Sequence, residues 1–464
     1  MYQSEGGIFT KQFFKGKDAD MTQGSVLGQL ISFAIPMMLG LLFQQLYNTV
    51  DTIVVGRFVG KEAMAAVGST GSILNMLVGF SSGLFNGAGV IISQHYGAHD
   101  EKKLHTSVHT TLSIALIMCI LFTLIGISMV NPMLRLMDTP DDVYASSRQY
   151  LTIYFSGISG LLLYNMGSGI LRAVGDSRRP LYILIFSALV NIAGDLIFVV
   201  GFNMGVAGVA YATLISQCLS ALLVLFLLSR DKEAYGVQWN KLCLNKEVIK
   251  SILNIGLPSG IQQAITSFSN VFVQGYINQF GSACMAGWSG YNKVDAFAMI
   301  PVQAIAMGST TFVGQNFGAK KLDRARKGVK TALSLSISVT IALSLLMMVL
   351  ARPLLNLFTT DPEVVDYGQK FILLISPFCF TLCFNQIFAG ALRGTGDAKA
   401  PMYILLFSFV LFRQLYLFVA KLLGNAFVMI GLAYPMGWVM CSFLLYLWFR
   451  RSILGKKGAV YTEK

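Results

Sequence analysis

Charged residues are scarce in this chain. They make up 12% of its 464 residues, and 55% are hydrophobic, whereas an ordinary soluble domain has roughly 25% charged residues. The mean hydropathy is +0.63. This composition excludes an ordinary soluble protein and predicts an integral membrane protein. Residues 1–25 are polar and lack the apolar core of a cleavable signal peptide, so we expect none.

Cysteine and histidine are also few. The seven cysteines are scattered without the spacing of a metal site, and we interpret Cys379 and Cys383, one helical turn apart, as packing residues. The four histidines form two pairs at i, i+4 spacing, which is a spacing that can bind metal; they are His95, His99, His105 and His109. Their charged neighbours and the lack of nearby cysteine favour a solvated loop. We therefore expect no metal centre there and no cofactor.

Long apolar runs recur throughout the chain. A helix needs about 20 apolar residues to cross a hydrocarbon core of about 30 Å. We predict twelve such helices, at residues 28–56, 66–93, 107–130, 145–170, 180–200, 206–229, 251–278, 285–314, 331–351, 368–391, 401–422 and 426–449. The expected fold class is therefore an all-α integral membrane protein.

The chain contains an internal sequence duplication. LRAVGD at 171–176 returns as LRGTGD at 392–397, an offset of 392 − 171 = 221 residues, and QHYGA at 94–98 returns as QNFGA at 315–319. We interpret LRxxGD as a turn between helices, because glycine permits a tight turn. Two repeats of six helices have the same orientation in the membrane, and secondary transporters commonly use such a duplication.

These features divide the chain into five parts. We predict an N-terminal tail (1–25), an N-lobe of helices 1–6 (26–229), a linker (230–250), a C-lobe of helices 7–12 (251–450) and a C-terminal tail (451–464).

The basic residues predict the orientation. With the N-terminus inside, 26 Lys and Arg fall in inside segments and 7 in outside segments, while Lys293 and Arg413 lie within helices. This bias places both termini, both tails and the linker in the cytoplasm of a multi-pass plasma-membrane protein. The net charge of +13 then reflects orientation and attraction to anionic lipid. No aromatic-interleaved basic patch indicates nucleic acid.

Ionisable residues inside a membrane are functional candidates because they are costly to insert. In the first half, Gln44, Asn48 and Asp51 share one helical face, and Asn191 and Asp195 share another. With the Thr213 hydroxyl, these residues could form one polar pocket in the N-lobe. Such a pocket can bind a proton or coordinate a hard cation. The alternative is a static hydrogen-bonded network that packs the helices.

The second half offers different charges. Lys293 and Asp295 lie two residues apart and do not face each other on a helix. Asp295 either faces a central cavity, where it would attract cationic substrates, or pairs with a basic residue elsewhere, such as Arg413. We assign six polar residues to the substrate cavity, namely Gln44, Asn48, Lys293, Asp295, Asn385 and Arg413.

Taken together, these features resemble the multidrug and toxic compound extrusion (MATE) family of the bacterial type over about residues 25–452. The resemblance implies two six-helix lobes that form a V around a cavity, and drug export driven by sodium or proton entry. Asp51, Asn191, Asp195 and Thr213 match the family's cation-coupling residues in the N-lobe. The helix 4 position of that site matches either Asn165 or Ser168.

The same resemblance assigns a hinge residue, and this sequence departs from the family's pattern in one respect. Pro36 matches a helix 1 proline proposed to bend on protonation. Family members that couple through the C-lobe carry acids in helices 7 and 10. Here helix 7 offers Gln262, Gln263 and Thr266, and helix 10 offers Asn385 and Gln386. We therefore predict coupling through the N-lobe, with H+ or Na+ bound at Asp51 and Asp195.

The predicted function is that of a secondary active exporter, not an enzyme. We expect a monomer that exchanges amphipathic organic cations for H+ or Na+ by alternating access. One alternative is a lipid-linked oligosaccharide flippase, which would need more cavity cations than Lys293 and Arg413. Another is a membrane prenyl-transfer enzyme, which would need paired acidic motifs on the cytoplasmic side. The sequence separates neither the two ions nor the possible drugs.

Overall fold

The computed structural model describes residues 20–136, 139–424 and 426–456. Most of the predicted N-terminal tail and the second half of the predicted C-terminal tail lie outside these residues. The described chain is helical, without a strand in these ranges. Each of the twelve predicted spans falls on one helix or on a run of successive helical segments.

The first repeat contains nine helical segments among the described residues. They are α2 (Val26–Val54), η1 (Val55–Val59), α3 (Lys61–Gly97), α4 (Glu101–Leu136), α5 (Asp141–Ser156), α6 (Ile158–Ala173), α7 (Arg178–Asp195), η2 (Leu196–Gly201) and α8 (Gly205–Arg230). Breaks such as Gly157, between α5 and α6, divide some of the predicted spans into two segments.

The linker contains a short 3-10 helix, η3 (Trp239–Lys241), and the second repeat follows it. Its segments are α9 (Lys246–Asn278), α10 (Ser282–Gly318), α11 (Leu322–Val349), α12 (Ala351–Asn356), α13 (Pro362–Ile375), η4 (Ser376–Phe378), α14 (Cys379–Gly394), α15 (Lys399–Leu406), η5 (Phe407–Phe412), α16 (Arg413–Leu422), α17 (Phe427–Gly431) and α18 (Ala433–Arg451).

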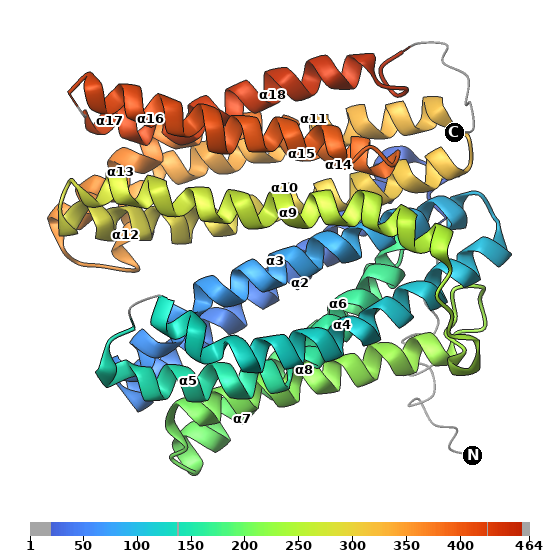
Figure 1. The fold of residues 1–464 in the computed structure, drawn as a ribbon. Coiled ribbons are helices and arrows are strands. Elements are labelled where there is room, and N and C mark those ends of the chain that lie inside the picture. The colour runs from blue at the N-terminus through green and yellow to red at the C-terminus, as the bar shows by residue number, and fades with distance from the viewer. Residues whose placement is uncertain (1–19, 137–138, 425, 457–464) are drawn as a thin grey trace, which may run out of the picture. The chain divides into compact units, whose positions relative to one another are not determined.

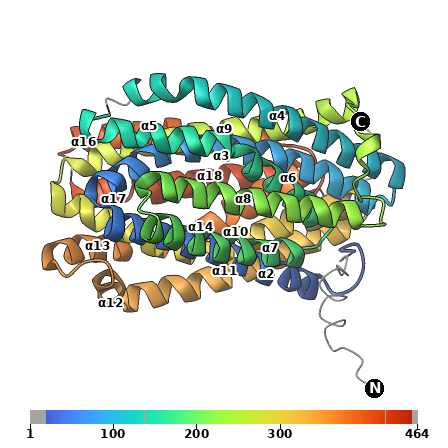
Figure 2. The same cartoon turned by 90° about the horizontal axis from the view of Figure 1, so that it is seen from below.

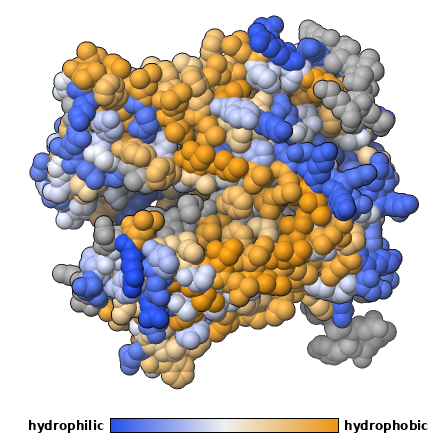
Figure 3. Space-filling model, in the orientation of Figure 1, coloured by the Kyte–Doolittle hydropathy of each residue, from blue (hydrophilic) through white to orange (hydrophobic). Residues whose placement is uncertain are grey.

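Within the described residues, eight helices are long and apolar enough to cross a membrane, and some of them join successive segments, such as α2 and η1. Many large hydrophobic side chains on these segments are exposed, for example Leu124 at 64% and Leu222 at 64%. Figure 3 shows hydrophobic surface over the middle of the helices and hydrophilic residues gathered toward their ends. Exposed apolar side chains of this kind are expected to face lipid.

The contacts divide the chain into two compact units. Unit 1 comprises Met1–Asp20 and Leu39–Leu253, and unit 2 comprises Met21–Met38 and Asn254–Lys464. In unit 1, α8 packs against α6 and α7; in unit 2, α10 packs against α11 and α14. Within each unit the helices lie lengthwise beside one another (Figure 1), as the second view also shows (Figure 2). The predicted lobe boundaries stay a prediction, but the units divide within α2 and α9 rather than between helices.

The repeated LRxxGD motif forms the predicted turn in both repeats. Gly175 and Gly396 adopt φ angles of 94° and 95°, a conformation that glycine reaches without steric cost. The carboxylate of Asp176 accepts hydrogen bonds from the backbone of Arg178 and Arg179, and Asp397 accepts one from Ala400. Each aspartate therefore satisfies backbone N–H groups at the start of the next helix.

The histidine cluster is only partly solvated, so the prediction of a solvated loop is wrong for one member. His99 is exposed between α3 and α4, whereas His109 is fully buried. The Nε2 atom of His109 accepts a hydrogen bond of 2.9 Å from the backbone of Gln238. Its Nδ1 atom lies 2.8 Å from the carbonyl oxygen of His105. This histidine therefore fastens the linker to α4.

Candidate cation site

Two aspartates of unit 1 meet near the ends of their helices. Asp51 lies in the last turn of α2, and Asp195 is the last residue of α7. Each helix continues directly into a π-helical segment, η1 or η2. Such segments widen the backbone and are frequent at functional sites. The local structure thus marks the same two positions as the sequence.

The carboxyl groups of Asp51 and Asp195 lie within hydrogen-bonding reach of each other. Asp195 is fully buried, and Asn191, one turn earlier on α7, is 2% exposed. Ionised carboxylates only accept hydrogen bonds, so the two groups cannot hydrogen-bond directly to each other unless one of them is protonated, and a cation between them would offset their repulsion. The arrangement therefore favours binding of a positive charge.

Several polar atoms around this pair are buried and lack a hydrogen-bond partner within the described part of the chain. They are Oδ1 of Asp51, both carboxylate oxygens of Asp195, and the amide oxygen and nitrogen of Asn191. More than nine in ten buried polar groups in proteins are paired, so such a concentration needs an explanation. Carboxylate and amide oxygens are ligands for hard cations. The donor set therefore fits Na+, and the acid pair also fits H+.

Tyrosines surround the acid pair. Tyr47, on the same helix as Asp51, and Tyr150, on α5, both lie within electrostatic range of Asp51. The rings of Tyr150 and Tyr154 are 6.2 Å apart. These tyrosines were not among the predicted site residues, which were acids, amides and the small hydroxyls of threonine and serine. Their spacing of four residues on one helix, Tyr150 to Tyr154, was the available signal.

The other predicted coupling residues lie in the same unit. Thr213 is 8% exposed on α8. On α6, Ser168 is fully buried and Asn165 is half-buried. Which of these two residues completes the site stays a prediction, as does the role of each residue in coupling.

The residues predicted to line the substrate cavity are divided between the units. In unit 1, Gln44 and Asn48 are exposed on α2. In unit 2, Lys293 lies over the ring of Phe358, with Nζ 5.3 Å from its centroid. Asn385 is buried; its amide donates to the carbonyl of Trp438 and accepts from Ser442. Their part in substrate binding stays a prediction.

Arg413 is the buried cation of unit 2. It is 3% exposed, and its Nη2 atom donates to Ser269 Oγ at 2.8 Å and to Asn270 Oδ1 at 2.9 Å. The guanidinium carbon lies 4.8 Å from the ring centroid of Tyr434. Its Nε atom is buried without a partner among the described residues. The helix that it begins, α16, follows a third π-helical segment, η5.

Asp295 does not form an ion pair with Arg413. It lies beside Tyr291 on its own helix, and the phenol of Tyr434 lies within electrostatic range of both charged groups. Of the two alternatives for Asp295, pairing with Arg413 is therefore wrong in this structure. Residues 251–278 of α9 contain no carboxylate. They supply Thr266, whose buried hydroxyl has no hydrogen-bond partner among the described residues.

Comparisons with known proteins show what the chain as a whole resembles. The family model described as MatE matches residues 36–197 and 258–418, one match in each repeat. Two similar proteins of Bacillus subtilis (strain 168) are named "Probable multidrug resistance protein YpnP" and "Probable multidrug resistance protein YoeA". YpnP is 29% identical over 97% of this chain and 100% of its own length, and YoeA is 29% identical over 83% and 84%.

A solved structure supports the fold. It is described as an outward-facing conformation of a multidrug resistance MATE family transporter; it has a TM-score of 0.88 at 22% identity and covers 94% of this chain and 97% of its own. The prediction of an all-helical membrane protein with two six-helix halves is thereby confirmed.

Proposed function

We propose that this chain, which belongs to the MATE family of transporters, exports amphipathic organic cations in exchange for H+ or Na+ bound at Asp51 and Asp195. One observation carries the proposal: two carboxyl groups face each other inside a membrane unit, among buried oxygens without partners. A static packing network would satisfy those oxygens, because unpaired buried polar groups are costly. A site that alternately binds and releases a cation leaves them available.

The binding step follows from electrostatics. Without a bound cation, the two carboxylates repel each other. Entry of H+ or Na+ removes this repulsion and draws the end of α2 toward the end of α7. Pro36 weakens α2 in its interior because proline removes one backbone hydrogen bond. We expect α2 to bend there, so that cation binding and drug release occur in different conformations of an alternating-access cycle.

The driving force depends on the charge that moves. Each elementary charge that crosses a membrane potential of about 100 mV exchanges about 2.3 kcal/mol with the field. A monovalent drug exchanged for one cation therefore gains nothing from the potential and is driven by the ion gradient alone. We expect both termini to lie in the cytoplasm of a plasma-membrane protein. The cation is expected to enter from the outside. We also expect the chain to act as a monomer.

The test is ethidium transport in inverted membrane vesicles with either a pH gradient or a sodium gradient imposed. The two gradients identify the coupling ion in one preparation. Asp51→Asn and Asp195→Asn should each abolish gradient-driven transport. Asp295→Asn, which removes a membrane acid of unit 2, is the matched control and should retain part of it. Full transport in either of the first two variants would refute the site in unit 1.

A further inference from the structure

The residues that precede α2 are fastened to the last turn of α10 and the first turn of α11, within unit 2. The backbone N–H of Met21 donates to Gln315 Oε1 at 2.9 Å, and the side-chain amide of Asn316 donates to the carbonyl of Met21 at 3.0 Å. Gln315 and Asn316 begin the repeated QNFGA motif. Both side chains are fully buried. One task of that motif is therefore to hold the entry into α2.

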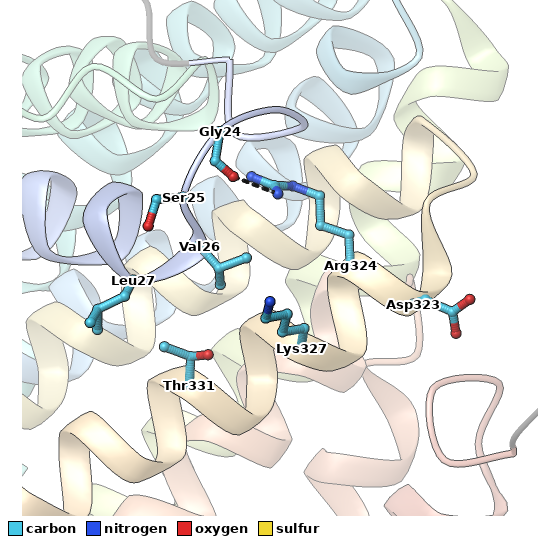
Figure 4. Close-up of a pocket in the computed structure, with 8 residues that line it drawn as sticks. All are labelled: Gly24, Ser25, Val26, Leu27, Asp323, Arg324, Lys327 and Thr331. Atoms are coloured by element: carbon cyan, nitrogen blue, oxygen red, sulfur yellow. Dashed lines mark hydrogen bonds between the residues drawn. The ribbon is translucent and has the colours of Figure 1, made fainter.

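Arg324 adds a charged clamp to this attachment. Its guanidinium donates to the carbonyls of Met21, Gln23 and Gly24 at 3.1, 2.6 and 2.8 Å and to Gln29 Oε1 at 2.7 Å. The Gly24 bond borders a pocket of about 490 Å³ (Figure 4). The planar fork of arginine suits several acceptors at once, and hydrogen bonds from a charged donor are the stronger ones. One side chain thus fixes the turn before α2 and its first turn.

The clamped helix passes from one compact unit to the other. Residues Met21–Met38 belong to unit 2, whereas Leu39 and the rest of α2, including Asp51, belong to unit 1. The change occurs within one turn of Pro36. The start of the helix is therefore held by Arg324, and its end carries a carboxylate of the candidate cation site.

The first helix of the second repeat shows the reciprocal arrangement without a charged clamp. Residues up to Leu253 of α9 belong to unit 1, and the remainder, from Asn254 onward, belongs to unit 2. The residue before α9, Asn245, donates its backbone N–H to Thr110 Oγ1 at 3.4 Å. At the repeat offset Arg324 corresponds to Lys103, since 324 − 221 = 103, and Lys103 instead pairs with Asp100 at 3.5 Å. The arginine clamp is specific to the helix that bears Asp51.

We infer that Arg324 is a positioning residue for ion coupling: it fixes the start of α2, so that a displacement at Asp51 bends the helix at Pro36 instead of moving it as a rigid body. This inference rests on the proposed cation site. A continuous helix that is not attached at its start moves as a rigid body when its other end is displaced. With the start held, the motion concentrates where a backbone hydrogen bond is missing.

The test measures motion on both sides of Pro36 with spin labels. Leu27 and Leu46 are 47% and 44% exposed, and each is replaced by cysteine in turn. Cys243, the exposed native cysteine among the seven, is replaced by serine beforehand. Saturating Na+ or acid should change the spectrum at position 46 and leave that at position 27 unchanged. In Arg324→Ala, both labels should respond.

Arg326→Ala is the matched control. Arg326 lies on the same helix but donates to the carbonyls of Ile453 and Leu454 and to Asp323, not to residues before α2. We expect it to behave as the parent protein does, and Arg324→Lys to recover part of the parent behaviour. Ethidium transport by Arg324→Ala should fall about tenfold in maximal rate, which corresponds to about 1.4 kcal/mol. Its KM for ethidium should not change, because Arg324 is bound to the residues before α2 and is not one of the residues assigned to the substrate cavity.

The outcomes separate the inference from the function on which it rests. A silent label at position 46 in the parent protein would overturn the inference, whereas full ethidium transport in Asp51→Asn would overturn the cation site on which it rests. A response at position 46, with position 27 silent in Arg324→Ala as well, would overturn the inference alone. So would a maximal rate equal to that of Arg326→Ala. Folding of each variant is checked by its membrane yield and by a single symmetric peak in size-exclusion chromatography.

Discussion

The guanidinium of Arg179 donates to the carboxylate of Asp231 at 2.7 Å, which joins the start of α7 to the linker residue that directly follows α8. The same guanidinium donates to Asp176 in the LRxxGD turn and to the Tyr235 hydroxyl at 3.0 Å. Arg179 is 3% exposed and Asp176 is 3% exposed. At the repeat offset Arg179 corresponds to Ala400, so this network belongs to unit 1 alone. It fixes the linker to that unit.

Removal of Arg179 should strongly destabilise unit 1. Arg179→Met leaves two carboxylates without their partner, and breaking a buried ion pair in this way costs about 3–5 kcal/mol. Thermal unfolding of the purified protein in detergent measures the loss. Arg178→Met is the control, because Arg178 is exposed and substitution of such a surface residue changes stability by about 0.5 kcal/mol or less. Equal melting temperatures for the two variants would contradict the assigned role.

Much of this fold could be predicted from the sequence because each membrane helix is recognisable from a local run of apolar residues. The apolar runs located all twelve helical spans, and the repeated LRxxGD located both turns, where Gly175 and Gly396 have left-handed φ angles. The proximity of Asp51 and Asp195 was also predictable, because a carboxylate buried in a membrane is expected to pack against the polar face of another helix.

The attachments made by the ends of helices were not predictable. Met21 and Gln315 are 294 residues apart, and no local pattern joins residues that far apart. Charged residues between membrane helices are usually solvated, so Arg324 was counted only among the basic residues of the inside segments that set the orientation. His109 was misread for the same reason, because a charged neighbourhood in sequence indicated solvent where the folded linker covers the ring.

Close packing of α6 against α8 depends on Gly160. A Cβ atom there would lie 2.8 Å from the backbone nitrogen of Cys218, which is backbone and cannot rotate away. Gly160→Ala should therefore destabilise the protein by about 1–3 kcal/mol. Gly169→Ala is the control on the same helix, since nothing lies within 4 Å of the added methyl. It should be neutral or stabilise by about 0.4–1 kcal/mol. Melting temperatures that fall equally in both variants would argue against this contact.

Arg413 should contribute to transport and not to stability. Its hydrogen-bond partners Ser269 and Asn270 are neutral. Unlike Arg179→Met, Arg413→Met therefore leaves no carboxylate without its partner. A buried charge without a carboxylate partner is costly to desolvate, so an apolar side chain of similar length at this position should not lower stability. We expect an unchanged or higher melting temperature and reduced ethidium transport. A melting temperature as low as that of Arg179→Met would show that Arg413 serves mainly to pack α16.

Pro36→Ala should stiffen α2 and slow transport without removing the cation site. Alanine restores a backbone N–H that can donate to the carbonyl of Ser32, and a proline inside a helix costs about 3 kcal/mol relative to alanine. Because the helix then resists bending, binding of the cation at Asp51 no longer drives the conformational change. We expect a lower maximal rate of ethidium transport with cation binding retained, as measured by calorimetry in detergent. Pro132→Ala is the control, since Pro132 also lies inside a long helix, α4, but on a helix that carries no candidate coupling residue. Equal transport rates in the two variants would show that α2 does not bend at Pro36 during the cycle.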